Sequence, residues 1–438
     1  MKYEKIDQSL FIENRKRFMK HMKPNSIAIF NSNYEYVWNG DASHTFKQHS
    51  DLFWLTGIDQ EDSILVIYPD CPIEDFRETL FLKQTNEHIA VWEGHKYTKE
   101  EATEASGVKS IFWNSEFEAK IRQITNLADT IYLDLNENNR FSYKSPYKDL
   151  DFAHEMKAKF PLHHYERAAP ILQRLRSIKL ETELALIRHA ISISKKGFER
   201  LLNYVKPGVW EYEVEAELIH EFIRNRATGH SFHPIVASGA SACVLHYVEN
   251  NRQCNDGDLL LVDCGVDYAN YASDMTRTFP VNGRFTARQK EVYNAVLRVQ
   301  REARKLLAPG TKWPEFQKSV EQVMEKELVD LGLLTMDDIK NQNPKWPALK
   351  KYFPHGNSHF LGIEVHDVGR YYEPMAAGMV FTNEPGIYIP EEGIGIRIEN
   401  NVLITETGPL DLMDEIGMPI EVEEIENIMA NASKIISV

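Results

Sequence analysis

The sequence predicts two domains, an α/β domain over residues 1–171 followed by an α+β domain over residues 172–438. Three observations support this fold class. The chain has 438 residues, more than one hydrophobic core ordinarily serves. Short apolar runs between turn residues dominate before Pro170, whereas long stretches of helical periodicity follow it. In the second part helix pairs precede strands twice, an order that hints at two related halves around a curved antiparallel sheet flanked by helix pairs, although the two halves are too dissimilar in sequence to claim a repeat.

The first domain opens with an amphipathic helix over residues 8–22 and a buried strand over residues 26–32. Further apolar runs of strand length are bounded by turn residues, and we expect a strand in each and a helix between the last two. The runs are KQHSDLFWLTGI, DSILVIYP, ETLFLK, HIAVWEG, IFWNS and TIYLDLN, and the helical stretch is EFEAKIRQITNLA. No dense cluster of ionisable groups occurs along this part of the sequence, so we assign it no chemistry.

The second domain opens with helices and continues with strands. Its predicted helices are ILQRLRSIK, ETELALIRHAISISKKGFERLLNYV, EYEVEAELIHEFIRNRA, FTARQKEVYNAVLRVQREARKLL and WPEFQKSVEQVMEKELVDLGLL. Strands are predicted in SFHPIVASG, ACVLHYV and DLLLVDCGV, between the first helix pair and the second.

Composition argues against several classes of protein. A formal net charge of −15 argues against a nucleic-acid partner, because binding phosphates requires a basic face. The four cysteines show no CxxC spacing, and so few in a long chain do not form a disulfide scaffold. The amino terminus has no apolar stretch of signal-peptide length, and no run approaches a membrane span. We therefore expect a cytoplasmic protein with neither a nucleic-acid nor a membrane partner.

Two aspartates follow a buried apolar run in LLLVDCGVDYANYASDMTRTFP. Asp263 lies at the carboxyl end of the run, where a strand delivers a side chain into a cleft. Asp274 lies in the next predicted strand, and a turn around residues 268–270 can return it to face Asp263. Either aspartate alone could cap a turn or pair with Arg277, so their interpretation as a site depends on the residues downstream.

A second cluster of ionisable side chains lies between residues 355 and 399. Its first part, HGNSHFLGIEVHDVG, spaces histidines among glycines, which packing alone does not explain. Its second part, FTNEPGIYIPEEGIGIRIEN, contains a strand in which Arg397 and Glu399 share one face, with Gly395 leaving room beside them. The candidate residues are His355, His359, His366, Glu384, Arg397 and Glu399, with His246 in VLHY as a further candidate.

The two clusters together supply four carboxylates and imidazoles. Four carboxylates held close together cannot all stay ionised without compensation, and two divalent cations balance their charge. Oxygen-rich ligation with one imidazole favours Mn²⁺, with Zn²⁺ and Co²⁺ as alternatives. Two such ions about 3.5–4 Å apart can activate a water and polarise a carbonyl group. The clusters therefore predict a metallohydrolase with two divalent metal ions.

With these residues in view, the chain resembles aminopeptidase P, the Xaa-Pro aminopeptidases of the pita-bread metallopeptidase family. The resemblance covers nearly the whole length. It is carried by KQHSDLFWLTG, SGASACVLHYVEN, DGDLLLVDCGVDYANYASDMTRTFPVNG, HGNSHFLGIEVHDVG, NEPGIYI and GIGIRIEN. It implies an amino-terminal domain of the creatinase/aminopeptidase P type over residues 1–171 and a pita-bread catalytic domain over residues 172–438.

The resemblance also implies a role for each site residue. The implied metal ligands are Asp263, Asp274, His359, Glu384 and Glu399, with Asp274 and Glu399 bridging the two ions. The implied catalytic residues are His246, His355, His366, Glu384 and Arg397. Glu384 would move a proton, the histidines would stabilise the tetrahedral intermediate and place the proline, and Arg397 would support the ligands.

The activity implied is that of an exopeptidase. A metal-bridging hydroxide would hydrolyse the Xaa-Pro bond at the amino terminus of peptides that carry proline at the second position. Trp92 resembles a tryptophan that relatives contribute across an interface, so a homo-oligomer, a dimer or a tetramer, is also implied.

Two other functions stay open. A prolidase restricted to Xaa-Pro dipeptides would use the same chemistry, and turnover of a dipeptide without turnover of a pentapeptide would identify it. A pita-bread protein that has lost its ligands would instead serve as a binding module. The presence of all five ligand types argues against a binding module, whereas a metal content below about one ion per chain would favour it.

Overall fold

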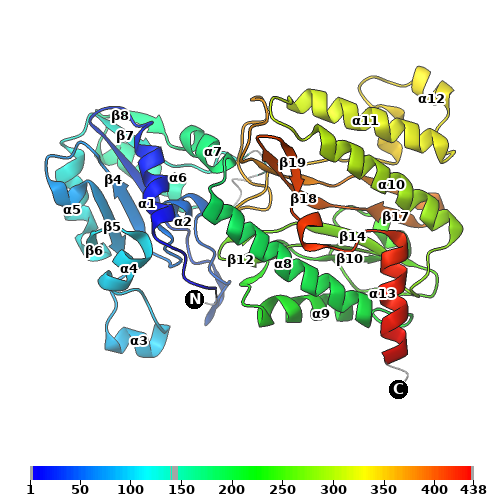
Figure 1. The fold of residues 1–438 in the computed structure, drawn as a ribbon. Helices are drawn as coiled ribbons and strands as arrows, with labels where there is room; N and C mark the ends of the chain where they lie inside the picture. Colours follow the sequence, from blue (N-terminus) through cyan, green and yellow to red (C-terminus); the bar gives the residue numbers. More distant parts are fainter. Residues whose placement is uncertain (1–2, 139, 141–146, 436–438) are drawn as a thin grey trace. The chain divides into compact units, whose positions relative to one another are not determined.

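The computed structural model describes residues 3–138, 140 and 147–435. The chain divides into two compact units, one of Glu4–Arg176 and the other of Met1–Tyr3 with Ser177–Val438. We call them the amino-terminal unit and the carboxy-terminal unit. Figure 1 shows that each contains both helices and strands. The division falls slightly beyond the boundary that the sequence predicts after residue 171.

A six-stranded mixed sheet forms the centre of the amino-terminal unit, in the order β6-β5-β4-β1-β7-β8. Its strands are β1 (Ser26–Asn31), β4 (Ile64–Ile67), β5 (Glu78–Leu82), β6 (Ser110–Trp113), β7 (Thr130–Leu133) and β8 (His164–Arg167). β4 is antiparallel to both of its neighbours, β1 and β5, whereas the pairs β5–β6, β1–β7 and β7–β8 are parallel. The two short strands β2 (Val37–Asn39) and β3 (Ala42–Ser43) pair with each other outside this sheet.

The helices of this unit are α1 (Ser9–Met19), α2 (Ser50–Thr56), α3 (Glu87–Glu93), α4 (Lys99–Ser106), α5 (Phe117–Thr125) and α6 (Lys148–Lys159), while α7 (Ala169–Ser177) ends at the division. Ile27 of β1 and Ile131 of β7 are fully buried in one hydrophobic cluster with Ile121 of α5 and Met156 of α6. Burying such side chains stabilises the unit by about 1.5–3 kcal/mol each before chain entropy is subtracted. The predicted helices over residues 8–22 and in EFEAKIRQITNLA are confirmed.

Two predicted strands of this unit are helices instead. KQHSDLFWLTGI contains α2, whose side chains are buried on every side, so its apolar run shows no helical period. His49 accepts a hydrogen bond from the Asp51 backbone N–H at its start, and Gly57 ends it with φ 68°. HIAVWEG contains α3, where the Asn86 side chain accepts from the Ile89 N–H. In both places a capping side chain decides the local structure.

The carboxy-terminal unit alternates helix pairs with strands, as the sequence predicts. The helices are α8 (Glu181–Tyr204), α9 (Glu211–Arg224), α10 (Ala287–Leu306), α11 (Trp313–Asp330), α12 (Met336–Lys340) and α13 (Val422–Ile435). Three-stranded antiparallel sheets follow the orders β10-β11-β14, β13-β12-β9 and β15-β18-β19, and β16 pairs with β17. Their bounds are β9 (Gly229–His230), β10 (Ile235–Ser238), β11 (Leu259–Cys264), β12 (Val266–Tyr268), β13 (Tyr271–Ala272), β14 (Met275–Pro280), β15 (Val380–Asn383), β16 (Gly386–Ile389), β17 (Ile394–Arg397), β18 (Asn400–Thr405) and β19 (Gly408–Asp411).

The strand predicted in ACVLHYV is wrong. Residues Gly239–Cys243 form a 3-10 helix, η3, and a turn follows that contains His246. Gly239 begins η3 with φ 53°, a conformation that a glycine adopts without strain. The small residues of this stretch let η3 approach β17 closely.

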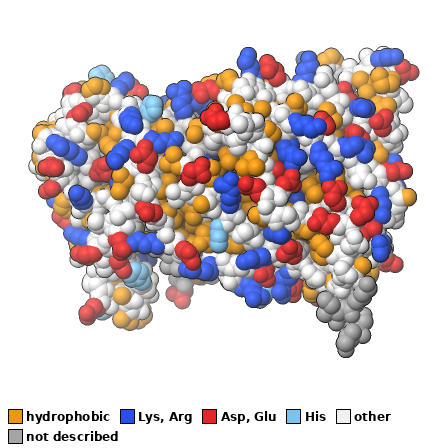
Figure 2. Space-filling model, viewed as in Figure 1, with side chains coloured by type: hydrophobic (Ala, Val, Ile, Leu, Met, Phe, Trp, Pro, Cys, Tyr) orange, Lys and Arg blue, Asp and Glu red, His pale blue; other side chains and the backbone are white. Residues whose placement is uncertain are grey.

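The face drawn in Figure 2 carries acidic and basic side chains interspersed over both units. Among the described residues, no helix is both long enough and apolar enough to cross a membrane.

Candidate metal centre

The strand pair β11 and β14 brings the two predicted aspartates to one place. The strands are antiparallel, with Asp263 opposite Thr276, and Asp274 directly precedes β14. The chain between them forms the small hairpin β12–β13, whose two turn residues, Ala269 and Asn270, have φ 53° and 64°. Positive φ at both central residues is the requirement of a tight two-residue hairpin turn. The predicted return of Asp274 toward Asp263 therefore follows from this turn.

His359 and Glu384 reach the same region from the start and the end of one backbone pairing. The Thr382 N–H in β15 donates to the His359 carbonyl oxygen at 3.0 Å, and Glu384 directly follows β15. The His359 Nε2 lies 3.4 Å from Asp274 Oδ2 and 3.7 Å from Glu384 Oε1. Its Nδ1 lies 2.9 Å from the Phe360 carbonyl oxygen, so Nδ1 carries the proton and donates. Nε2 then presents a lone pair to the carboxylates, as in metal-binding histidines.

Glu399 joins them from the break between β17 and β18. Its backbone N–H donates to the Thr276 carbonyl oxygen at 3.0 Å, and its Oε2 accepts from Thr276 Oγ1 at 2.7 Å. One ligand atom each from Asp274, His359 and Glu399 lies within 4.8 Å of the others. All three residues are buried.

The centre is short of positive charge. Burial raises the pKa of both Asp274 and Glu399 well above the ordinary values, and the neighbouring carboxylates raise it further. Arg397 donates from Nη2 to Asp263 Oδ2 at 2.7 Å, whereas Asp263 Oδ1 is buried and has no hydrogen-bond partner within the described part of the chain. One guanidinium does not balance four carboxylates. A buried acceptor without a donor, a correctly oriented imidazole and an oxygen-rich donor set all fit divalent cations.

Two residues of the centre were missed by the sequence analysis, Thr276 and Tyr388. The Tyr388 hydroxyl lies 2.8 Å from His355 Nε2 and accepts from Arg397 Nη1 at 2.7 Å. A Cβ at Gly386 would overlap this hydroxyl, so glycine is required there. Burial and the Arg397 charge lower the pKa of His355 to about 3, so its ring is neutral. Tyr388 could have been found from the sequence because it lies in NEPGIYI, four residues after Glu384.

The remaining predicted histidines occupy different places. The His366 ring lies with its centroid 3.7 Å from that of His359. His355 Nδ1 lies 3.9 Å from Glu384 Oε2. His246 is exposed in the turn after η3, near enough to His355 to contribute to lowering the pKa of that ring after burial and Arg397. The structure thus gathers the candidate residues at one centre, with His246 on an exposed turn.

The prediction for Gly395 is corrected. The sequence suggested that it leaves room beside Arg397 and Glu399, but a Cβ at residue 395 would overlap the backbone carbonyl of Ala242 in η3. The space is therefore filled by the chain itself, which packs η3 against β17.

Comparison with known proteins agrees with this geometry. Residues 185–406 match Metallopeptidase family M24, and residues 11–132 match Aminopeptidase P, N-terminal domain. The chain belongs to the aminopeptidase P family of M24 metallopeptidases. It is 34% identical to the Xaa-Pro aminopeptidase of Haemophilus influenzae over 97% of this chain and 98% of that protein. It is 32% identical to human Xaa-Pro aminopeptidase 3 over 92% of this chain and 80% of that protein.

Solved structures show the same fold over the whole length. The structure of aminopeptidase P from Escherichia coli with the inhibitor Pro-Leu matches with a TM-score of 0.86 and 32% sequence identity. The match covers 98% of this chain and 100% of the Escherichia coli chain. The fold is therefore the amino-terminal α/β domain and pita-bread catalytic domain of this family.

Proposed function

We propose that Asp263, Asp274, His359, Glu384 and Glu399 hold two divalent cations, Mn²⁺ by preference, and that the protein removes an amino-terminal residue that precedes proline. Family membership supports the reaction, since relatives that match nearly the full chain are Xaa-Pro aminopeptidases. The single observation that carries the metal assignment is the gathering of the Asp274, Glu384 and Glu399 carboxylates around the buried His359. The mixed oxygen and nitrogen donors favour Mn²⁺, with Zn²⁺ and Co²⁺ as alternatives.

When bound, the two cations would polarise the peptide carbonyl and lower the pKa of water. The side chains of this protein divide the remaining tasks. Glu384 faces both His355 and His359 and is suited to accept and return a proton. Arg397 holds Asp263 in position through the 2.7 Å contact. We assign His366 a hydrogen bond to the charge that develops on the carbonyl oxygen, and His246 and His355 contacts with the substrate.

The two predicted domains have different tasks. We assign the chemistry to residues 172–438 and a supporting role to residues 1–171. The number of subunits, a dimer or a tetramer, stays a prediction that sedimentation analysis would test. The cytoplasmic location also stays a prediction, tested by cell fractionation.

The test uses the full chain, freed of metal by chelation and reloaded with Mn²⁺. We expect about two ions per chain by elemental analysis and release of the first residue from Xaa-Pro-Yaa tripeptides. Matched Xaa-Ala-Yaa tripeptides, which lack the proline, should be cleaved far more slowly. A preparation that holds two ions and leaves every Xaa-Pro-Yaa peptide intact would contradict the proposal.

A further inference from the structure

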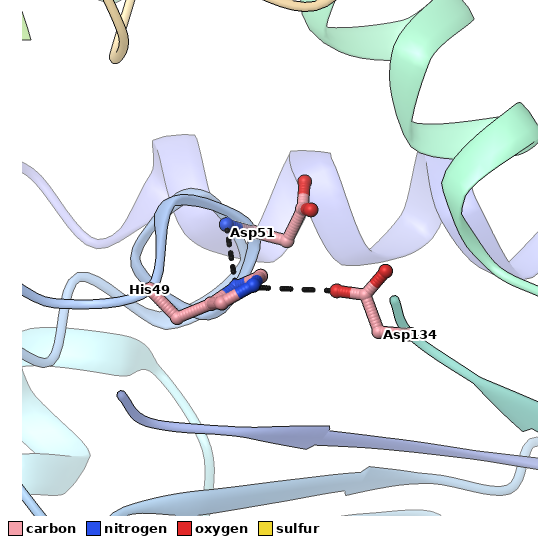
Figure 3. Close-up of side chains that lie close together, drawn as sticks. All are labelled: His49, Asp51 and Asp134. Atoms are coloured by element: carbon pink, nitrogen blue, oxygen red, sulfur yellow. Dashed lines mark hydrogen bonds and ion pairs between the residues drawn. The ribbon is translucent and has the colours of Figure 1, made fainter. Parts of the chain in front are cut away.

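A second buried cluster of metal-ligating side chains lies in the amino-terminal unit, where the sequence analysis assigned no chemistry. His49 directly precedes α2, Asp51 lies in its first turn, and Asp134 directly follows β7. One ligand atom of each lies within 4.8 Å of the others, and all three residues are at least nine-tenths buried. Figure 3 shows the His49 ring between the Asp51 backbone and the Asp134 carboxylate. The linear sequence hides this cluster because its members are far apart along the chain.

Asp134 is the first indication that something is bound here. It is 3% exposed, yet neither of its carboxylate oxygens has a hydrogen-bond partner among the described residues. His49 Nδ1 lies 4.0 Å from Asp134 Oδ2. Burial raises the pKa of Asp134 well above the ordinary value, and Asp51 and Asp149 raise it further. A buried carboxylate aimed at other acids without a donor is costly unless a proton or a cation lies between them.

The orientation of His49 is the second indication, and it is independent of the first. Its Nε2 lies 3.3 Å from Asp149 Oδ2, and Asp149 is fixed in turn by the Asn31 amide at 3.2 Å. With the proton on Nε2, the lone pair of Nδ1 points toward Asp134. A carboxylate that receives the far N–H of an imidazole is the usual support of a metal-binding histidine. Nδ1 accepts the capping hydrogen bond of α2 from the Asp51 N–H at 3.3 Å, which agrees with a proton on Nε2, and a bound ion would take the place of this hydrogen bond.

The charges of the cluster favour a divalent ion. Asp51, Asp134 and Asp149 supply three negative charges, and Arg176, which donates to Asp51 Oδ1 at 2.9 Å, supplies one positive charge. Lys148 nearby is paired with Asp62 at 3.3 Å. With His49 neutral, three negative charges and one positive charge leave a deficit that a divalent cation cancels. A proton on one carboxyl would leave one negative charge uncompensated.

We propose that His49 Nδ1, Asp51 and Asp134 bind one divalent transition-metal ion in the amino-terminal unit, separate from the catalytic centre, with Asp149 orienting His49. One imidazole with two carboxylates suits Zn²⁺ or Mn²⁺ better than Ca²⁺ or Mg²⁺, which take oxygen ligands. The ion would connect α2 to the carboxyl end of β7, which pairs in parallel with β1 and β8.

The test measures zinc on the full chain after the catalytic centre is disabled by Asp274→Ala with Glu399→Gln. Metal-free protein is titrated with ZnCl₂ and then dialysed, and zinc is counted by elemental analysis. We expect about one zinc ion per chain, and an anomalous peak beside His49 in crystals. Adding Asp134→Asn, nearly identical in shape, should abolish this binding. Asp151→Asn, an exposed change on the same helix as Asp149, should leave it unchanged.

A further variant distinguishes loss of zinc binding from loss of folding. Asp149→Asn keeps all three ligands and should weaken zinc binding by about 10–100-fold, as loss of a supporting carboxylate does elsewhere. The proposal is overturned if the catalytic-site variant retains no zinc, if the anomalous peak lies elsewhere, or if Asp134→Asn and Asp149→Asn both bind zinc like their parent. Failure of the proposed catalytic metals is distinguished from failure of this proposal, because the two bridging ligands are removed in every variant and the anomalous peak shows whether zinc lies beside His49 or at the remaining catalytic residues.

Discussion

At the scale of single residues, the hydroxyl of Thr276 connects two elements of the catalytic centre. It accepts from Arg397 Nε at 3.1 Å and donates to Glu399 Oε2 at 2.7 Å. The strand register places Thr276 directly opposite Asp263, which Arg397 also contacts. The Thr276 side chain therefore orients Glu399, a predicted metal ligand. It also orients Arg397, whose charge balances the predicted ligand Asp263. Such supporting hydrogen bonds fix ligand geometry in metal sites generally.

Replacing Thr276 by valine keeps the shape of the side chain and removes this hydroxyl. We expect Mn²⁺ affinity or catalytic rate to fall by about 10–100-fold, because Glu399 loses its donor. Thr278→Val is the matched control on the same face of β14, since the Thr278 hydroxyl bonds to backbone groups of Arg397, donating to its carbonyl oxygen at 3.2 Å and accepting from its N–H at 3.3 Å. Titration of metal-free protein with Mn²⁺ measures the difference. Equal effects of the two changes would contradict a specific role of the Thr276 hydroxyl in orienting Glu399.

Asp274 and His366 should differ in what their loss removes. Asp274→Ala deletes a predicted bridging ligand, so we expect metal content to fall and kcat/KM to drop by at least about 10³-fold. His366→Ala should keep the metal and lower kcat by about 10²–10³-fold, because its predicted task is a hydrogen bond in the transition state. Elemental analysis beside steady-state kinetics separates the two outcomes. Normal turnover by Asp274→Ala would contradict the assignment of that ligand.

At the scale of elements, local signals predicted some parts of the site and missed others. Asp263 and Asp274 were predicted together because one short hairpin connects their strands. The cluster of His49 and Asp134 was missed because it depends on α2, which is buried on every side, so that its sequence was interpreted as a strand. It also depends on β7, whose parallel pairing with β1 joins distant segments. Parallel pairing leaves no short turn in the sequence to mark it.

A buried ion pair holds the loop before β15 to the start of the carboxy-terminal unit. Lys179 Nζ lies 2.8 Å from Asp367 Oδ2, and both side chains are 1% exposed. Lys179→Met should lower the free energy of unfolding by about 3–5 kcal/mol, because it removes the cation that lies 2.8 Å from the buried Asp367 carboxylate. The double variant with Asp367→Asn should recover much of that loss, which chemical denaturation would measure. A single variant as stable as the parent would show that the pair is dispensable.

Helix α13 is attached through Glu426, and this attachment should depend on pH. Burial alone would raise the pKa of Glu426, but the Phe285 N–H, Lys290 and Arg284 outweigh it, so the pKa is lowered from 4.5. The ionised carboxylate is therefore favoured in the folded protein. Its contribution to stability is present above pH 4.5 and is lost as pH falls through the lowered pKa of the folded state.

Glu426→Gln should accordingly lower the free energy of unfolding near pH 7 by about 1–3 kcal/mol, the range for a hydrogen bond to a charged group. The difference from the parent should shrink as the pH falls below 4.5. Denaturation at a series of pH values measures it. A difference that stays constant across the series would exclude ionisation of Glu426 as the cause.

At the scale of the whole molecule, each unit contains a hydrophobic cluster and a group of side chains that we propose to bind metal. Ile27, Ile131 and Met156 belong to the core of the amino-terminal unit, whereas Leu261 and Tyr388 pack in a cluster of the carboxy-terminal unit. Chains built from more than one such unit commonly depart from a single cooperative unfolding transition. A ligand that binds one folded unit stabilises that unit by mass action.

Calorimetry of the full chain should therefore resolve two unfolding transitions, and the one that Lys179→Met lowers belongs to the carboxy-terminal unit. Saturating this unit with Mn²⁺ at about 100 times the dissociation constant should stabilise it by about 2.7 kcal/mol and raise that transition. Asp274→Ala should abolish the shift while leaving the transition visible. If Mn²⁺ raised the transition of Asp274→Ala as much as that of the parent, stabilisation by the catalytic centre would be excluded. The assignment of its ligands would then have to be revised.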